Sequence, residues 1–339
     1  MRVGFWPPVY GNWIISTDPT TRDASFEYTK RVTLLAEELG FDTMLLAEHF
    51  MNPVDPTLSQ LDAWSTAAAL AAVTERIEII AAVKPGFRAP GVIAKQAADI
   101  DHICGGRFAI NLVSAWWLTE FEMLGAPVLA HDDRYARSEE FLEIVKGSWT
   151  HDSFSYSGEH YQVHDATLVP KPVQRPHPQV YIGGESDQGR SLGARMADVF
   201  LINGRPVHEI DEIIRHVTRL AAGHGRHPGF GMSAFVICRD TEAEARAELE
   251  RLVELRQLDL KGYDTEVVML RTVIPGAKSL GTNGGLAAGL VGTPDQIAER
   301  IGEFEQAGIE TLLIQFHPVL EELERFGRQV LPLLTRSAP

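Results

Sequence analysis

Short apolar runs alternate with stretches whose apolar residues recur at helical spacing, and this alternation constrains the fold more than any other feature. Several runs are continuously apolar, as expected of parallel strands that are buried on both faces. Eight runs can be counted, at residues 3–6, 43–47, 77–81, 108–113, 179–182, 199–202, 231–237 and 311–316. Eight parallel strands joined by helices predict an α/β fold of the TIM (β/α)8 barrel type.

The segments between the runs carry residues that mark helix ends. Thr241 precedes an acidic first turn, and the pair Thr293 and Pro294 places a proline at a predicted helix start. Gly40 and Gly308 end predicted helices directly before strands. These positions support a succession of strand and helix units along the chain.

The whole chain, residues 1–339, is interpreted as a single barrel domain with two insertions. Near residues 151–178, short alternating patches followed by prolines predict a small hairpin and an extended connection. Near residues 256–290, a long stretch with GTNGG in its middle is typical of a lid over a binding site, and disorder without ligand is the alternative.

Charge and cysteine content exclude several classes of protein. The formal net charge of −15, from 46 acidic and 31 basic residues, argues against nucleic-acid binding. Cys104 and Cys238 are the only cysteines and lie far apart, so we expect neither a disulfide framework nor a metal site. No stretch approaches about 18 consecutive apolar residues. The amino terminus carries no apolar signal core, so we expect a cytoplasmic protein that does not enter a membrane.

Active sites of TIM barrels form at the carboxyl ends of the strands, so the residues after each run are candidates for chemistry. Glu48 and His49 follow the second run, and a histidine there suits proton transfer, with a cap or loop role as the alternative. Asn111, Ser114 and Trp116 end or follow the fourth run. Buried amide and hydroxyl groups need partners, which favours a ligand for Asn111, whereas packing explains Trp116 equally well.

A glycine pair after the fifth run precedes a serine at a predicted helix start. Gly183, Gly184 and Ser186 place backbone N–H groups and a hydroxyl where many TIM barrels bind a phosphate. A tight turn between strand and helix would use the same glycines. The position in the barrel favours the phosphate site.

Six motifs together resemble the luciferase-like flavin monooxygenases, above all the branch of dimethyl sulfone monooxygenase, pyrimidine oxygenase and alkanesulfonate monooxygenase. They are GNWIIST at 11–17, GGRFAINLVSAW at 105–116, DRYARSEEF at 133–141, PKPVQRPHP at 170–178, GGESD at 183–187 and LVGTP at 290–294. The resemblance covers nearly the whole chain. It implies reduced FMN (FMNH2) bound at the strand carboxyl ends, O2 as co-substrate, an NAD(P)H-dependent flavin reductase as partner, and a homodimer or homotetramer.

The resemblance also implies roles for individual residues. Asn111 and Glu120 match flavin-contacting positions. Tyr135 and Ser186 match positions near the flavin phosphate, beside Gly184. We therefore expect all five side chains or backbones to contribute to cofactor binding.

Four further residues match the family at single positions. Arg134, Ser138 and Glu48 are additional candidates for cofactor binding. Glu48 and His49 match the Glu-His pair of luciferase, whose histidine is associated with proton transfer at the flavin, although the dimethyl sulfone and pyrimidine branch differs at this position. The residues expected to act in catalysis are His49, Asn111, Ser114 and Trp116.

One departure from a related branch concerns the substrate. Alkanesulfonate monooxygenases, which the chain resembles, place an arginine and a histidine on the seventh strand, where this sequence has Ser233 and Phe235. A sulfonate is a permanent anion, and a guanidinium is its best partner. The departure predicts an apolar pocket for a small neutral substrate, either organosulfur or heterocyclic.

These features predict a two-component monooxygenase that inserts one oxygen atom from O2 into a small organic molecule. One alternative is an F420-dependent oxidoreductase that transfers hydride on the same barrel, and oxygen consumption with reduced FMN distinguishes the two. Another alternative is a non-catalytic flavin-binding barrel. The titratable residues Glu48, His49 and Glu120 at strand ends argue against that role.

Overall fold

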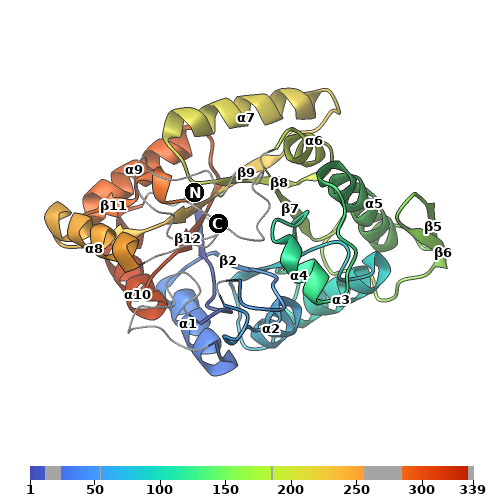
Figure 1. The fold of residues 1–339 in the computed structure, drawn as a ribbon, viewed down its shortest axis with the longest axis horizontal. Helices are drawn as coiled ribbons and strands as arrows, with labels where there is room; N and C mark the ends of the chain where they lie inside the picture. The colour runs from blue at the N-terminus through green and yellow to red at the C-terminus, as the bar shows by residue number, and fades with distance from the viewer. Residues whose placement is uncertain (12–23, 54, 185, 256–284, 335–339) are drawn as a thin grey trace.

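The strands form a barrel that is closed all the way round. The computed structural model describes residues 1–11, 24–53, 55–184, 186–255 and 285–334, and eight parallel strands close into the barrel within these ranges (Figure 1). The strands, in their order around the barrel, are β1 (Arg2–Phe5), β12 (Thr311–Gln315), β9 (Gly229–Phe235), β8 (Val199–Asn203), β7 (Gln179–Gly183), β4 (Phe108–Leu112), β3 (Glu78–Val83) and β2 (Thr43–Leu46). Because β1 pairs with both β12 and β2, no strand edge is left open. The predicted TIM barrel is confirmed.

Helices surround the strands, as Figure 1 shows. They are α1 (Phe26–Leu39), α2 (Ala63–Ala71), α3 (Pro90–Ile103), α4 (Leu118–Met123), α5 (His131–Thr150), α6 (Asp187–Met196), α7 (Val207–Ala222), α8 (Glu242–Leu255), α9 (Pro294–Gln306) and α10 (Val319–Gln329). Two short 3-10 turns, η2 (Leu286–Ala288) and η3 (Leu331–Leu333), accompany them. Among the described residues, no helix is long and apolar enough to cross a membrane.

The predicted helix ends are confirmed. The Thr293 side chain and Gln296 form a reciprocal capping box at the start of α9, with Pro294 in its first position. Thr241 Oγ1 accepts a hydrogen bond from the Glu244 N–H at 3.2 Å at the start of α8. Gly40 follows α1 with a φ of 88°, a left-handed conformation that glycine adopts at little cost.

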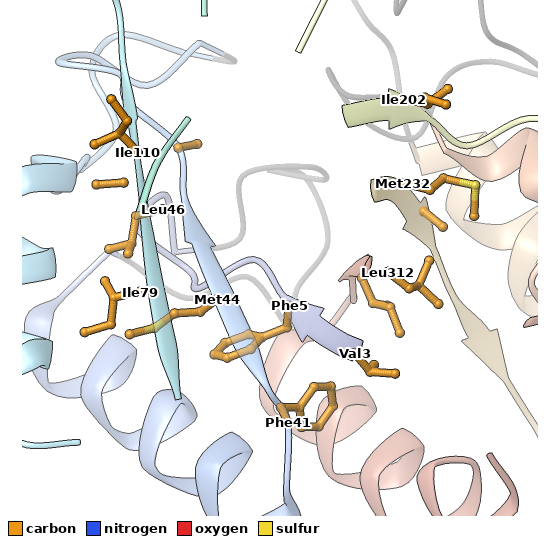
Figure 2. Packing of buried hydrophobic residues seen from close by; sticks show 14 of the residues in the cluster. Val3, Phe5, Phe41, Met44, Leu46, Ile79, Ile110, Ile202, Met232 and Leu312 are labelled. Carbon is orange, nitrogen blue, oxygen red and sulfur yellow. The ribbon is translucent and has the colours of Figure 1, made fainter. Parts of the chain in front are cut away.

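The apolar core has two layers that use alternate residues of each strand. One layer fills the barrel interior and draws on strand residues such as Leu45, Ile80 and Leu313. The other layer lies between the strands and the surrounding helices, and Figure 2 shows part of it, with Phe5 and Met44 pointing toward neighbouring side chains. Strands buried on both faces explain why their sequence runs are apolar without alternation.

The first predicted insertion has the expected hairpin. Strands β5 (Phe154–Ser157) and β6 (Gln162–Ala166) pair antiparallel outside the barrel. Most of the second predicted insertion, near 256–290, lies outside the described residues, and so does the proposed lid. Strands β10 (Ile237–Cys238), directly before α8, and β11 (Val291–Gly292), directly before α9, pair in parallel as a separate two-stranded sheet.

Candidate active site

A cavity lies at the carboxyl ends of the barrel strands and contains about 1080 Å³ of empty space, part of it open to solvent. Its wall combines apolar and aromatic side chains with a small number of polar groups, as ligand sites do. The predicted site residues that line it are Glu48, His49, Asn111, Ser114, Trp116, Arg134, Tyr135, Gly184 and Ser186. The barrel thus brings together the ends of β2, β4 and β7 and the first turns of α5.

His49 belongs to a buried cluster with an acid and a lysine. Lys84, directly after β3, donates from Nζ to Glu120 Oε2 at 2.6 Å and lies 2.9 Å from His49 Nδ1. The Glu120 oxygens lie 3.2 and 3.3 Å from the same imidazole nitrogen, and Glu120 also accepts a hydrogen bond from the Phe50 N–H at 2.7 Å. The side chains of Lys84, His49 and Glu120 are only 3%, 4% and 0% exposed.

The cluster shifts the pKa of each of its members. Burial, reinforced by the positive charge of Lys84, lowers the pKa of His49 to about 4, so the imidazole is neutral near pH 7. Burial alone would raise the pKa of Glu120, but Lys84 and His49 outweigh it and lower that pKa to about 2. Burial lowers the pKa of Lys84, and the Glu120 carboxylate opposes this effect. The cluster therefore contains a carboxylate, a buried amine that donates to it, and an uncharged histidine.

Glu48 lies in a second buried ion pair beside the first. Its carboxylate accepts hydrogen bonds from the Lys84 N–H at 2.6 Å and from Arg88 Nε at 2.7 Å. Burial raises the pKa of Glu48 to about 7 in spite of the positive charges of Arg88 and Lys84. Tyr10 lines the same side of the cavity, and burial with the charges of Glu120 and Glu48 raises its pKa well above the usual value. Tyr10 is therefore a neutral phenol.

The end of β4 supplies the predicted amide and hydroxyl. Asn111 is 4% exposed, and its Oδ1 is buried without a hydrogen-bond partner among the described residues. A buried amide oxygen without a partner costs about 1–3 kcal/mol, so a ligand that donates to it would gain that stabilisation. Ser114 Oγ lies 2.9 Å from Ser138 Oγ, which itself donates to the Arg134 carbonyl. Trp116 lines the cavity and packs edge-on against His49, with ring centroids 5.3 Å apart.

The end of β7 and the start of α6 form a cradle suited to a phosphate. Ser186 is the N-cap of α6, and its side chain accepts a hydrogen bond from the Gly189 N–H at 3.2 Å. Gly184 has a φ of 139°, and a Cβ there would lie 2.9 Å from Tyr135 Oη, so only glycine fits. Tyr135 reaches Gly184 from α5, and Arg134, its neighbour on that helix, lines the same cavity. A helix N-terminus favours a bound anion.

Two predicted residues do not line the cavity. Glu120 is fully buried behind His49 and Lys84, and Ser138 is fully buried behind Ser114. Each touches a residue that does line the cavity, so their predicted contribution to cofactor binding would act through these neighbours. On β9, Ser233 lines the cavity, whereas Phe235 is buried in the outer layer.

Sequence reasoning missed Lys84, the residue that joins the two ion pairs. The predicted third strand ended at residue 81, but β3 continues to Val83. Had the apolar run been extended to its last apolar residue, Lys84 would have stood directly at the carboxyl end of a strand. Tyr10 and Trp6, which also line the cavity, gave no signal because β1 is followed by two prolines and an irregular segment.

Comparison with known proteins agrees with this architecture. A family model described as Luciferase-like monooxygenase matches residues 9–311. The chain belongs to this family. It is 38% identical to an FMNH(2)-dependent dimethylsulfone monooxygenase of Pseudomonas putida, over 98% of this chain and 95% of the relative. It is 34% identical to a protein of the same name from Pseudomonas fluorescens, over 98% and 94%.

A solved structure shares the fold at low sequence identity. The long-chain alkane monooxygenase superposes with a TM-score of 0.80 at 20% identity, over 100% of this chain and 93% of that one. The resemblance inferred from the six motifs is therefore confirmed at the level of the family, and the enzyme is a monooxygenase of luciferase-like type.

Proposed function

We propose that this protein is a two-component monooxygenase that binds reduced FMN, supplied by a separate NAD(P)H-dependent flavin reductase, and oxidises a small neutral sulfone. Dimethyl sulfone, named for relatives at 38% and 34% identity, is the first candidate substrate. The observation that carries the proposal is the cavity itself, which combines a phosphate cradle at the start of α6 with the Asn111 amide oxygen, buried without a partner among the described residues.

The residues present fit FMN. Ser186 at the start of α6, with Arg134 and Tyr135, would hold the phosphate. Asn111 and His49 would face the ring system, and Asn111 Oδ1 would be free to accept a hydrogen bond from it. When bound, reduced FMN supplies the two electrons by which one oxygen atom of O2 enters the substrate and the other leaves as water.

The protein's own contribution is to orient and to exclude water. Aromatic side chains of Trp6, Tyr10 and Trp116 make up part of the cavity wall and limit the water beside the reacting atoms. Asn111 provides an amide held at a strand end, so it needs little reorganisation when charge develops nearby. His49 is a neutral imidazole next to the same space and holds a proton rather than a positive charge.

The cavity wall on β9 favours a neutral substrate. Ser233 lies there in place of an arginine, and its Oγ accepts a hydrogen bond from Gln315 Nε2 at 3.3 Å. The Lys84 cation is paired with Glu120, and Arg134 lies beside Tyr135 on α5. A sulfonate would therefore lack a guanidinium partner on β9, whereas a sulfone has no charge to neutralise.

The oxidation state of the sulfur in a sulfone determines which products the reaction can give. Its sulfur carries two oxygens and no lone pair, so an inserted oxygen must end on carbon. Oxidation of one methyl C–H bond gives a hydroxymethyl sulfone, which breaks its C–S bond to release formaldehyde and methanesulfinate. O2 is reduced, the methyl carbon is oxidised, and the sulfinate leaves with the electron pair of the broken bond.

The proposed setting follows from the same reaction. A supply of reduced flavin requires a reductase and NAD(P)H, which favours a cytoplasmic enzyme that meets the reductase transiently. The family resemblance further implies a homodimer or homotetramer. A heterocyclic substrate is the second candidate, since the cavity wall is largely aromatic and apolar.

A substrate panel tests the proposal. The protein would be supplied with a flavin reductase, FMN, NADH, O2 and, in turn, dimethyl sulfone, methanesulfonate or uracil, with mass spectrometry of the products. We expect methanesulfinate and formaldehyde from dimethyl sulfone, and no oxidation of methanesulfonate. Product from uracil alone would indicate a heterocyclic substrate instead of a sulfone. Hydride transfer from reduced F420 without any FMN-dependent product would replace it.

A further inference from the structure

Lys84 occupies a position between the two acids and the histidine of the cavity. It is 3% exposed and follows β3, while His49 follows β2 and Glu120 lies on α4. Its Nζ is 2.6 Å from Glu120 Oε2 and 2.9 Å from His49 Nδ1. Its backbone N–H also donates to Glu48. One lysine therefore links both acids to the imidazole.

The contact with His49 constrains where the imidazole proton lies. The Glu120 carboxylate at 2.6 Å favours the ammonium form of Lys84, which has three donors and no acceptor. At 2.9 Å, His49 Nδ1 must therefore offer its lone pair to Nζ, and the ring proton must lie on Nε2. Glu120 alone would favour the opposite arrangement, because a carboxylate only accepts and would draw a proton to Nδ1 at 3.2 Å. Lys84 Nζ lies closer to His49 Nδ1 than either Glu120 oxygen does, so the Lys84 contact favours the tautomer with the proton on Nε2.

We propose that Lys84 is a positioning residue that fixes His49 as the neutral tautomer with its proton on Nε2, so that His49 presents an N–H donor to the cavity. The inference deepens and rests on the proposed function, because His49 lines the space in which the flavin and substrate would react. Lys84 itself reaches that space as one of the lining residues, but its hydrogen bonds are directed toward Glu120 and His49.

The surroundings of His49 agree with a neutral donor. The charged groups near it are Lys84, Glu120 and Glu48, and the neutral Tyr10 ring lies 5.8 Å away between centroids. Burial and Lys84 both oppose a positive charge on the imidazole. The rings of Trp116 and Trp117, with centroids 5.3 and 5.7 Å from that of His49, hold its plane. The ring is thus fixed in both orientation and protonation.

Removal of Lys84 should reverse the tautomer. In Lys84→Met, the Glu120 carboxylate remains beside Nδ1 and no cation competes for that nitrogen. The proton should therefore move to Nδ1, or the imidazole should bind a second proton at a higher pH than in the wild type. Either change withdraws the fixed Nε2 donor or turns the ring into a cation.

Nitrogen-15 NMR of histidine-labelled, flavin-free protein tests this directly. The His49→Gln variant identifies the His49 signals among the 12 histidines. In the wild type near pH 7 we expect an unprotonated Nδ1 and a protonated Nε2, and in Lys84→Met the reverse or an imidazolium. A wild-type signal with the proton on Nδ1, or a Lys84→Met signal unchanged from the wild type, would overturn the proposal.

Two further variants keep the test decisive. Lys146→Met is the matched control, because Lys146 is another largely buried lysine whose Nζ donates to the Met196 carbonyl far from the cavity. It should leave the His49 signals unchanged. If Lys84→Met fails to fold, Lys84→Met combined with Glu120→Leu removes both charged groups and leaves no donor or acceptor of either residue beside Nδ1. A mixture of the two tautomers should then appear, and a single form with the proton on Nε2 would contradict the role of Lys84.

Activity separates this inference from the proposed function. With any substrate that the panel identifies, Lys84→Met should lower kcat by at least tenfold with little change in KM, and its pH profile should gain a transition between pH 5 and 8 as His49 titrates. An absence of product in the wild type would reject the proposed function while the NMR result still stands. Wild-type kcat and pH profile in a variant with a reversed tautomer would show that the Nε2 donor is not used.

Discussion

The barrel has a polar cluster at each end, and the two clusters differ in what their members leave unsatisfied. At the amino end, Arg2 Nη2 donates to Glu78 Oε2 at 2.8 Å, and the Tyr181 hydroxyl donates to the same oxygen at 3.2 Å. The Arg2 side chain is 41% exposed. This cluster closes the bottom of the barrel with its groups paired among themselves.

At the carboxyl end, the corresponding cluster is more deeply buried and faces a cavity. Lys84, at the other end of the same strand β3 as Glu78, pairs with Glu120, which is fully buried. The neighbouring Asn111 Oδ1 has no partner among the described residues. The same strand thus has a partly exposed structural ion pair at one end. At its other end it has a buried site in which Asn111 Oδ1 lacks a partner among the described residues, and this division agrees with the separation of stability and chemistry in TIM barrels.

The largest expected effect comes from breaking the buried pair. Glu120→Leu leaves the Lys84 charge buried without a partner, and we expect it to lower the free energy of unfolding by about 3–5 kcal/mol. Glu78→Leu is the matched change at the amino end. Because water can reach Arg2, that loss should be only about 1–2 kcal/mol. Urea unfolding measures the free energy of unfolding of both variants. Equal losses would show that the ion pairs at the two ends of the barrel do not differ in their contribution to stability.

Asn111→Leu tests the unsatisfied amide at the carboxyl end. The substitution keeps the volume and removes the polar group, so the variant should fold and still bind reduced FMN. Product formation should fall by about 100- to 1,000-fold, the scale for loss of one preorganised polar group. Ser114→Ala, which removes a hydroxyl bonded to Ser138, should do less. Stopped-flow oxidation of the bound reduced flavin, read with product yield, measures the effect. A wild-type product yield from Asn111→Leu would show that Asn111 has only a structural role.

The phosphate cradle allows a nearly isosteric comparison. Asp and Asn are both good N-cap residues, so Ser186→Asp and Ser186→Asn should each preserve the start of α6. The Asp variant places a like charge against the phosphate and should lose flavin binding, whereas Ser186→Asn should bind within about 1–2 kcal/mol of the wild type. Fluorescence titration with FMN compares them. Equal FMN binding by both variants would show that the flavin phosphate does not bind at the start of α6.

The smallest expected effect lies at the amino end. Tyr181→Phe removes one hydroxyl that donates to Glu78, and it should cost about 1 kcal/mol of stability. The barrel interior is otherwise unchanged, so kcat and KM with the identified substrate should equal those of the wild type. A clear loss of activity without loss of stability would show that the two ends are coupled.

Much of the fold could be predicted from the sequence because strands buried on both faces leave continuous apolar runs. The boundaries of those runs were accurate within about two residues, but that error mattered at β3, where it separated Lys84 from its strand. The pairing of Lys84 with His49 and Glu120 joins segments 35 and 36 residues apart. Such a contact forms only when the barrel closes, so no short stretch of sequence predicts it. Gly184 and Ser186 could be predicted because a tight turn and a helix start depend on residues that are neighbours in the sequence.

The site at which reduced FMN binds is the central claim of the proposed function. A crystal structure of the protein soaked anaerobically with FMNH2 should place the phosphate within hydrogen-bond distance of Ser186 at the start of α6, with the ring system against Asn111 and His49. Flavin in another place, such as the surface groove that Arg190, Arg215 and Arg219 line on α6 and α7, would contradict it. So would the absence of flavin from the cavity at saturating concentration.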